Sequence, residues 1–144
     1  MLDGDMNRFG HLGFSLLIFS PLLSLFSFTE ISIAVIFSLL PDIDLILKVE
    51  HRRYTHNITF ALIMALIFFL FLNDILVSAF IFAGIFSHIL ADLFTKKKFA
   101  PFYPLSNKKF ALGLFRSDNL AVNYSLLFLG LFSFAYFSNI ISIR

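Results

Sequence analysis

The sequence predicts an all-α, polytopic membrane helix bundle. Hydrophobic residues make up 59% of the 144 positions and charged residues only 14%. The mean hydropathy is +0.90. A soluble domain of this length would have too few polar side chains to cover its surface. No internal repeat and no polar linker divides the chain. We therefore expect a single integral membrane domain over residues 1–144.

Five apolar segments approach the roughly 20 residues that a helix needs to cross the hydrocarbon core. The first, 9–28, is expected to be a retained helix, because its apolar run is long for a signal peptide and no small-residue cleavage site follows. The second, 31–47, contains Pro41, which cannot donate a helical hydrogen bond and should break or kink the last turns. The remaining three segments are residues 57–72, 75–94 and 119–141.

The connections between these segments differ in charge. Residues 73–74 form a short turn and residues 95–118 a longer loop. If all five segments span, every basic residue except Arg144 falls on one side, and the opposite turns carry only Glu30 and Asp74. The excess of Lys and Arg predicts that this side is cytoplasmic, with the N-terminus inside and the C-terminus outside. The second and third segments are short, so a shallow or re-entrant helix is an open alternative.

Seven ionisable residues stand out, because charged groups inside membrane helices cost roughly 2.5–3.5 kcal/mol each and usually mark function. The topology, drawn from Lys and Arg alone, puts all seven at the same depth on the cytoplasmic face. They include every histidine in the chain. The seven are His11, Asp42, Asp44, His51, His56, His88 and Asp92.

The spacing of these residues suits a metal site. His88 and Asp92 are four positions apart and share one helix face. Asp42 and Asp44 straddle the helix end broken by Pro41. Imidazole with carboxylate is a ligand set for Zn, Mn, Fe or Ni. Seven candidates exceed what one tetrahedral zinc needs, so we expect one or two divalent ions. Taken singly, each group also has a structural reading, as a helix cap or a packing hydrogen bond.

At these residues the sequence resembles the membrane-bound metal-dependent hydrolase family described as LexA-binding, inner membrane-associated hydrolases. The resemblance runs from about residue 8 to residue 118. It departs from the family pattern at Gly10, Arg53 and Asn57, where threonine, glycine and serine are usual. The matching pieces are Gly10-His11, residues 40–44 (LPDID), residues 51–56 (HRRYTH), residues 87–92 (SHILAD) with Thr95, and residues 104–106 (PLS) with Phe110.

The resemblance implies a hydrolase of the inner membrane. In such a site, a divalent ion would activate a water molecule and polarise the oxygen of a phosphoester or ester. We expect Asp44 and Asp92 to be the catalytic carboxylates, with Asp44 acting as a ligand, a bridging group or the general base. Arg52, Lys108 and Lys109 are expected to bind a phosphate group of the substrate.

The predicted depth of the site favours a small amphiphilic substrate and membrane lipid as partners, with no role for nucleic acid. The absence of cysteine excludes thiol nucleophiles, and no Gly-x-Ser-x-Gly motif supports a serine hydrolase. Two other classes remain open. One is an ion-coupled transporter, and the other is a non-catalytic membrane adaptor whose metal only ties helices together.

Overall fold

A computed structural model describes residues 6–48, 50 and 52–142. The regular secondary structure of the described residues is helical, and in place of strands they contain only two isolated bridges, Thr95 with Phe115 and Phe99 with Phe110. The predicted fold class is therefore confirmed as all-α. The elements are α1 (Arg8–Phe19), η1 (Ser20–Ser24), α2 (Phe28–Phe37), η2 (Leu40–Asp42), α3 (Ile43–Leu47), α4 (Ile58–Leu72), α5 (Ile75–Phe94) and α6 (Leu120–Ser142).

The last three helices match the predicted segments closely, because their ends carry clear local signals. Asp74 caps α5, and its side chain accepts hydrogen bonds from the N–H groups of Leu76 and Val77. Asn57 caps α4 in the same way by accepting from the N–H of Phe60 at 2.8 Å. Both helices then run without interruption, since neither contains proline.

The first two segments are broken at their prolines. The break near Pro41 is confirmed, since α2 ends at Phe37 and a 3₁₀ turn follows. The break near Pro21 is a difference from the predicted continuous helix over 9–28, because α1 ends at Phe19 and continues as η1. As a result, only α5 and α6 in the described part of the chain are long and apolar enough to cross a membrane, and α4 is shorter.

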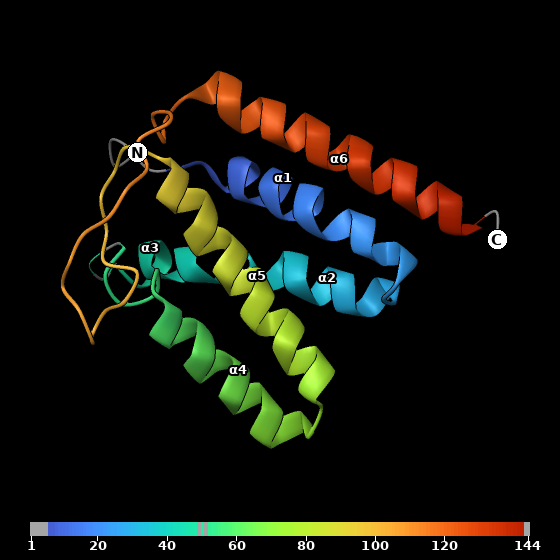
Figure 1. Ribbon diagram of the computed structural model, residues 1–144, viewed down its shortest axis with the longest axis horizontal. Helices are drawn as coiled ribbons and strands as arrows, with labels where there is room; N and C mark the ends of the chain where they lie inside the picture. Colours follow the sequence, from blue (N-terminus) through green and yellow to red (C-terminus); the bar gives the residue numbers. More distant parts are fainter. Residues whose placement is uncertain (1–5, 49, 51, 143–144) are drawn as a thin grey trace.

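The helices pack through small residues. In Figure 1, α1 lies alongside α6, while α2 and α4 lie against α5. A Cβ atom at Gly13 would come within 2.3 Å of the backbone of Leu126 and Leu127 on α6. A Cβ at Gly84 of α5 would meet the carbonyl oxygen of Ala34 on α2 at 2.2 Å. Such backbone contact is typical of helix packing in membranes, where side-chain burial contributes little.

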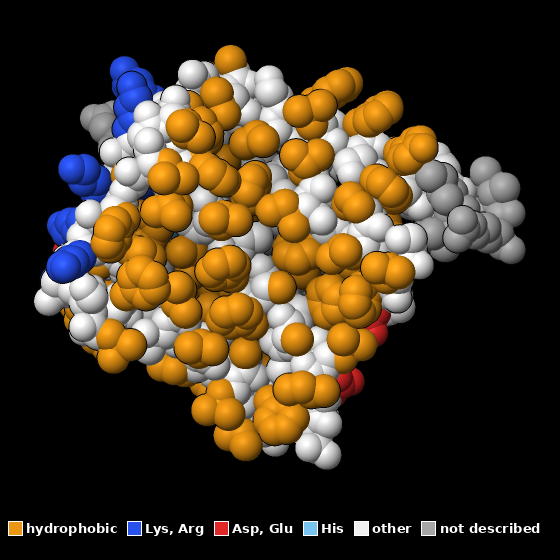
Figure 2. Space-filling view, viewed as in Figure 1, with side chains coloured by type: hydrophobic (Ala, Val, Ile, Leu, Met, Phe, Trp, Pro, Cys, Tyr) orange, Lys and Arg blue, Asp and Glu red, His pale blue; other side chains and the backbone are white. Residues whose placement is uncertain are grey.

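The two ends of the bundle differ in charge. One end gathers α3, the start of α1 and the loop between α5 and α6, and the other holds the η1–α2 and α4–α5 turns (Figure 1). Figure 2 shows a face largely covered by hydrophobic side chains, with Lys and Arg gathered at the first end. We call this first end the basic end. The core near the opposite end is an apolar cluster of Phe19, Leu23, Ile31, Ala34 and Phe80.

Candidate metal centre

The buried ionisable side chains of the described residues belong to one cluster at the basic end. Every other described Asp, Glu, Lys and Arg is at least partly exposed. The cluster contains six of the seven predicted ligands, together with one arginine. The seventh, His51, lies outside the described residues. The members are His11, Asp42, Asp44, Arg52, His56, His88 and Asp92.

Two imidazoles and two carboxylates face one another at the centre of the cluster. His56 Nε2 lies 3.6 Å from both Asp42 Oδ1 and Asp92 Oδ2. His88 Nε2 lies 3.6 Å and 3.7 Å from the same two oxygens. Two ligand atoms held about 2.1 Å from one ion at the tetrahedral angle are about 3.4 Å apart. The four imidazole–carboxylate distances are therefore close to those between ligand atoms in a first coordination sphere.

The break before Pro41 helps to orient His88. Because α2 ends at Phe37, Ser38 is its C-cap, and the Ser38 carbonyl group lies beyond the hydrogen-bonded turns of the helix. The carbonyl oxygen of Ser38 lies 2.7 Å from His88 Nδ1. A carbonyl oxygen only accepts, so Nδ1 carries the proton, and in the neutral imidazole Nε2 presents its lone pair to the carboxylates. Within the described residues, His88 Nε2 and Asp92 Oδ2 make no hydrogen bond.

Asp44 lies behind His56. Its Oδ2 is 3.3 Å from His56 Nδ1 and accepts hydrogen bonds from the Thr55 hydroxyl at 2.9 Å and from the Arg52 N–H at 3.2 Å. Thr55 Oγ1 is also 2.9 Å from His56 Nδ1. Because that hydroxyl donates to Asp44, it can accept only from a protonated Nδ1. Both imidazoles therefore have the tautomer that a metal ligand needs.

The carboxylates change the titration of His56. Burial alone would lower the pKa of its imidazole. Hydrogen bonds to the carboxylates of Asp42 and Asp44, with the charge of Asp92, outweigh burial and raise the pKa above its ordinary value. A cation at this position is thus favoured, whether it is a proton or a metal ion.

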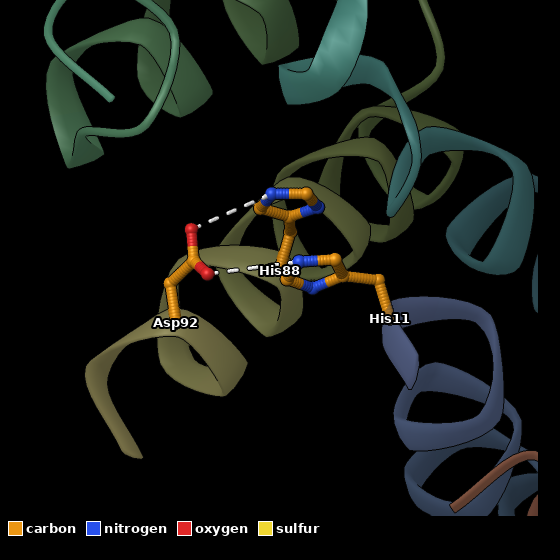
Figure 3. A group of neighbouring side chains, drawn as sticks. All are labelled: His11, His88 and Asp92. Carbon is orange, nitrogen blue, oxygen red and sulfur yellow. Dashed lines mark ion pairs between the residues drawn. The ribbon is translucent and has the colours of Figure 1, made fainter. Parts of the chain in front are cut away.

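His11 extends the cluster to α1. Its ring stacks on that of His88, with centroids 3.6 Å apart and planes 8° from parallel. Figure 3 shows both rings beside Asp92, whose Oδ1 lies 3.6 Å from His11 Nε2. Two sets of ligand atoms lie within 4.8 Å of one another, one formed by His11, His88 and Asp92 and the other by Asp42, His56 and His88. Because His88 has only its Nε2 to offer both sets, the geometry favours one ion over two.

The guanidinium of Arg52 donates hydrogen bonds within and beside the cluster. It is buried, its backbone has a φ of 63°, and its guanidinium donates to the carboxylate of Asp92. It also contacts the hydroxyl of Thr95 at 3.4 Å and the carbonyl oxygen of Lys97 at 3.3 Å. Lys108 and Lys109 are exposed. Lys109 lines a cavity of about 350 Å³ together with Arg52, whereas Lys108 is absent from its lining.

The charges of the cluster do not balance without a cation. It contains three carboxylates and one guanidinium, so it carries two negative charges when its histidines are neutral. Removing a charge from water costs several kcal/mol unless it is compensated. One divalent ion would bring the sum to zero. The donor set, its spacing and its charge therefore all fit a divalent metal.

The sequence alone predicts no role for Ser38 or for Thr55. Ser38 contributes a backbone carbonyl, which any residue could supply, so no sequence signal marks it. Thr55 stands immediately before His56, but a threonine next to a histidine is not informative until the fold brings Asp44 beside both. The buried pair of Arg52 and Asp92 joins residues 40 positions apart and likewise depends on the fold.

The chain belongs to the YdjM inner membrane protein family, whose sequence model matches residues 6–143. This membership agrees with the membrane location predicted from composition and with the inner-membrane part of the resemblance. No curated protein and no solved structure matches the chain.

Proposed function

We propose that this member of the YdjM inner membrane protein family is a multi-pass, metal-dependent hydrolase. It would act at the cytoplasmic face on a phosphoester or ester of a lipid-like substrate. The observation that carries this proposal is the cluster of two imidazole nitrogens and two carboxylate oxygens, buried together at 3.6–3.7 Å. Perturbed, mutually facing ionisable groups of this kind are typical of functional sites.

The residues that would hold the ion are Asp42, His56, His88 and Asp92, with the ring of His11 stacked on that of His88. A bound divalent ion lowers the pKa of a coordinated water and polarises a substrate oxygen, which is the chemistry that hydrolysis needs. Asp44 and Thr55 keep the proton of His56 on Nδ1 and hold the ring in place. This geometry favours an orienting role for Asp44 over the ligand, bridging and general-base roles.

Arg52 and Asp92 have different roles in the cluster. Arg52 donates to Asp92 Oδ1, which leaves Oδ2 directed at the two imidazoles. The guanidinium thus orients a proposed ligand while it also lines the neighbouring cavity of about 350 Å³. With Lys109 it gives that cavity a positive charge that suits an anionic group.

The proposed topology has five spans, with the N-terminus and the site inside. Its support is the separation of charge along the bundle, since the basic loops meet at one end and the turns bearing Glu30 and Asp74 at the other. The helices broken by proline would cross as bent segments, which is tolerated where neighbouring helices cover the freed backbone groups.

A non-catalytic adaptor is the second candidate, because the four proposed ligands are only 0–5% exposed. A closed coordination sphere of this kind suits a structural ion. A transporter has less support. It needs polar groups along the whole membrane depth, but the buried charges of the described residues lie at one end.

The test is a hydrolysis assay on purified protein in detergent, with phosphatidic acid, phosphatidylcholine and a soluble phosphodiester as substrates. We expect the wild type to cleave one of these substrates. EDTA and the His88→Ala substitution should each abolish the activity. Adding Zn²⁺ or Mn²⁺ should restore the activity of the EDTA-treated wild type. Ser78→Ala, on the same helix but near the opposite end, should leave activity intact. Activity that resists EDTA would overturn the mechanism. Tight metal binding without hydrolysis of any substrate would favour the adaptor.

A further inference from the structure

A second cavity, of about 420 Å³, reaches the cluster through Asp42. Its volume lies within the roughly 300–1,000 Å³ of small-molecule sites. It runs along the C-terminal end of α2 and along α3, and its lining includes no residue of the α5–α6 loop. We call it the α2–α3 groove. The lining residues that matter here are Arg8, Ile36, Phe37, Asp42, Ile43 and Ile46.

The α2–α3 groove is apolar apart from two charged residues. Every lining residue except Arg8 and Asp42 is isoleucine, leucine or phenylalanine. Ile36 and Ile46 are 66% and 68% exposed, so the groove opens on the outside of the bundle. In a membrane protein such an opening faces hydrocarbon chains, which an apolar lining can accept without desolvating polar groups.

Arg8 supplies the only positive charge among the described residues that line the groove. The residue is exposed and makes no ion pair within the described part of the chain. It stands three positions before His11 on α1, so the two side chains share a helix face. The groove therefore combines an apolar wall, an arginine available to bind an anion, and a carboxylate of the proposed metal centre.

We propose that the α2–α3 groove binds an anionic amphiphile, a phosphate ester with a hydrocarbon chain. The chain lies along Ile36, Phe37 and Ile43, and Arg8 holds the phosphate beside Asp42. Arginine suits this role because its guanidinium pairs with phosphate oxygens in a bidentate manner. This assignment names the substrate class of the proposed hydrolase and rests on that function, and it makes Arg8 a substrate-binding residue.

The chain contains no tryptophan, so one introduced tryptophan reports on the groove alone. Phe37→Trp places the fluorophore in the groove. Phe128→Trp places it on α6, at an exposed residue that does not line the groove. Each variant is reconstituted in phosphatidylcholine nanodiscs containing a small fraction of brominated phosphatidic acid or brominated phosphatidylcholine. Bromine on the chains quenches a tryptophan that they contact.

We expect phosphatidic acid to associate with the Phe37→Trp site about fivefold more tightly than phosphatidylcholine, the preference that one basic group gives near a membrane. Phe128→Trp should show no preference. Adding Arg8→Gln to Phe37→Trp should remove the preference. Adding Lys96→Gln, at an exposed lysine that does not line the groove, should leave it. Soluble glycerol phosphate should not relieve the quenching, because it lacks the chain. Relief by glycerol phosphate, or equal quenching by both brominated lipids at Phe37→Trp, would overturn the assignment.

The metal content of the same samples separates this inference from the proposed function. If the groove shows no headgroup preference in protein that still binds metal, only the groove assignment is overturned. If the groove selects phosphatidic acid but hydrolysis resists EDTA, the lipid site is supported and the metal-dependent mechanism is overturned.

Discussion

Two regions of this bundle are equally buried and yet are held together in different ways. The apolar cluster includes Phe19, Ile31 and Phe80, which are 4%, 1% and 6% exposed. In the candidate metal centre, His56, His88 and Asp92 are 0%, 1% and 0% exposed. The first region needs only close packing, whereas the second has an excess of negative charge that packing cannot satisfy.

The comparison teaches that burial alone does not mark the site. What distinguishes the basic end is that it buries carboxylates, which repel one another when no cation is bound. Stability and metal binding should therefore respond to different substitutions in the two regions. Four predictions test that separation, in order of expected effect.

The largest effect is expected from Asp92→Ala. The variant leaves the guanidinium of Arg52 buried without its carboxylate, which costs about 3–5 kcal/mol in comparable pairs. Thermal unfolding in detergent with EDTA measures this loss without any contribution from metal. Glu50→Ala is the matched control, because it removes the carboxylate of an exposed arginine pair, and it should leave the midpoint nearly unchanged. Equal midpoints for the two variants would contradict the account.

Phe80→Ala should destabilise the opposite region without affecting the metal. Phe80 packs edge-to-face on Phe26, with ring centroids 4.9 Å apart, and its truncation leaves a cavity. We expect a loss of about 3 kcal/mol, the lower end for such truncations. Metal content per folded chain should equal that of the wild type. A loss of metal from this variant would mean that the two regions are not separable.

Thr55→Val should weaken metal binding while leaving the fold intact. The change removes the hydroxyl that bridges Asp44 and His56, and loss of such partners typically lowers metal affinity about 10–100-fold. Competition with a fluorescent chelator measures the affinity. Thr59→Val, four positions later on α4, controls for loss of a hydroxyl outside the cluster. The same affinity for the two variants would exclude the proposed role of Asp44 and Thr55.

The smallest effect is expected from pH. Because the pKa of His56 is raised in the folded metal-free protein, protonation of His56 stabilises the fold fully below the unfolded pKa. This contribution is lost as pH rises through the raised folded value. A metal ion takes the place of that proton, so the increase in unfolding temperature caused by metal should grow as pH rises above the ordinary histidine pKa of about 6.5. A metal-induced increase that is constant with pH would contradict this reading of His56.

Much of the fold could be predicted, because its signals are local. The largely apolar, proline-free run between Asp74 and Thr95 defines α5 without reference to the rest of the molecule. The rule that predicts the break at Pro41 applies equally to Pro21, although the apolar run there predicts one helix through residue 28. Proline lacks an N–H at either position, and the chain continues as a 3₁₀ turn at both.

The site could be predicted only in part. Six of the predicted ligands could be gathered from charge and topology, because membrane helices seldom contain ionisable groups without cause. The separate roles of Asp42 and Asp44 could not be predicted. They are two positions apart, and only the fold directs one toward His56 Nε2 and the other toward Nδ1. The sequence predicts that Arg52 binds the substrate, because its pairing with Asp92 can be recognised only in the folded structure.

The central claim is that the buried cluster holds a divalent cation, and the most direct test is metal content by elemental analysis. Wild-type protein purified without chelator should contain about one divalent ion per chain, as expected when His88 serves a single ion. Asp42→Ala and His88→Ala should each contain less than about a tenth of that amount, while Ser78→Ala retains it. Wild-type protein with no more metal than the His88→Ala variant would contradict the account.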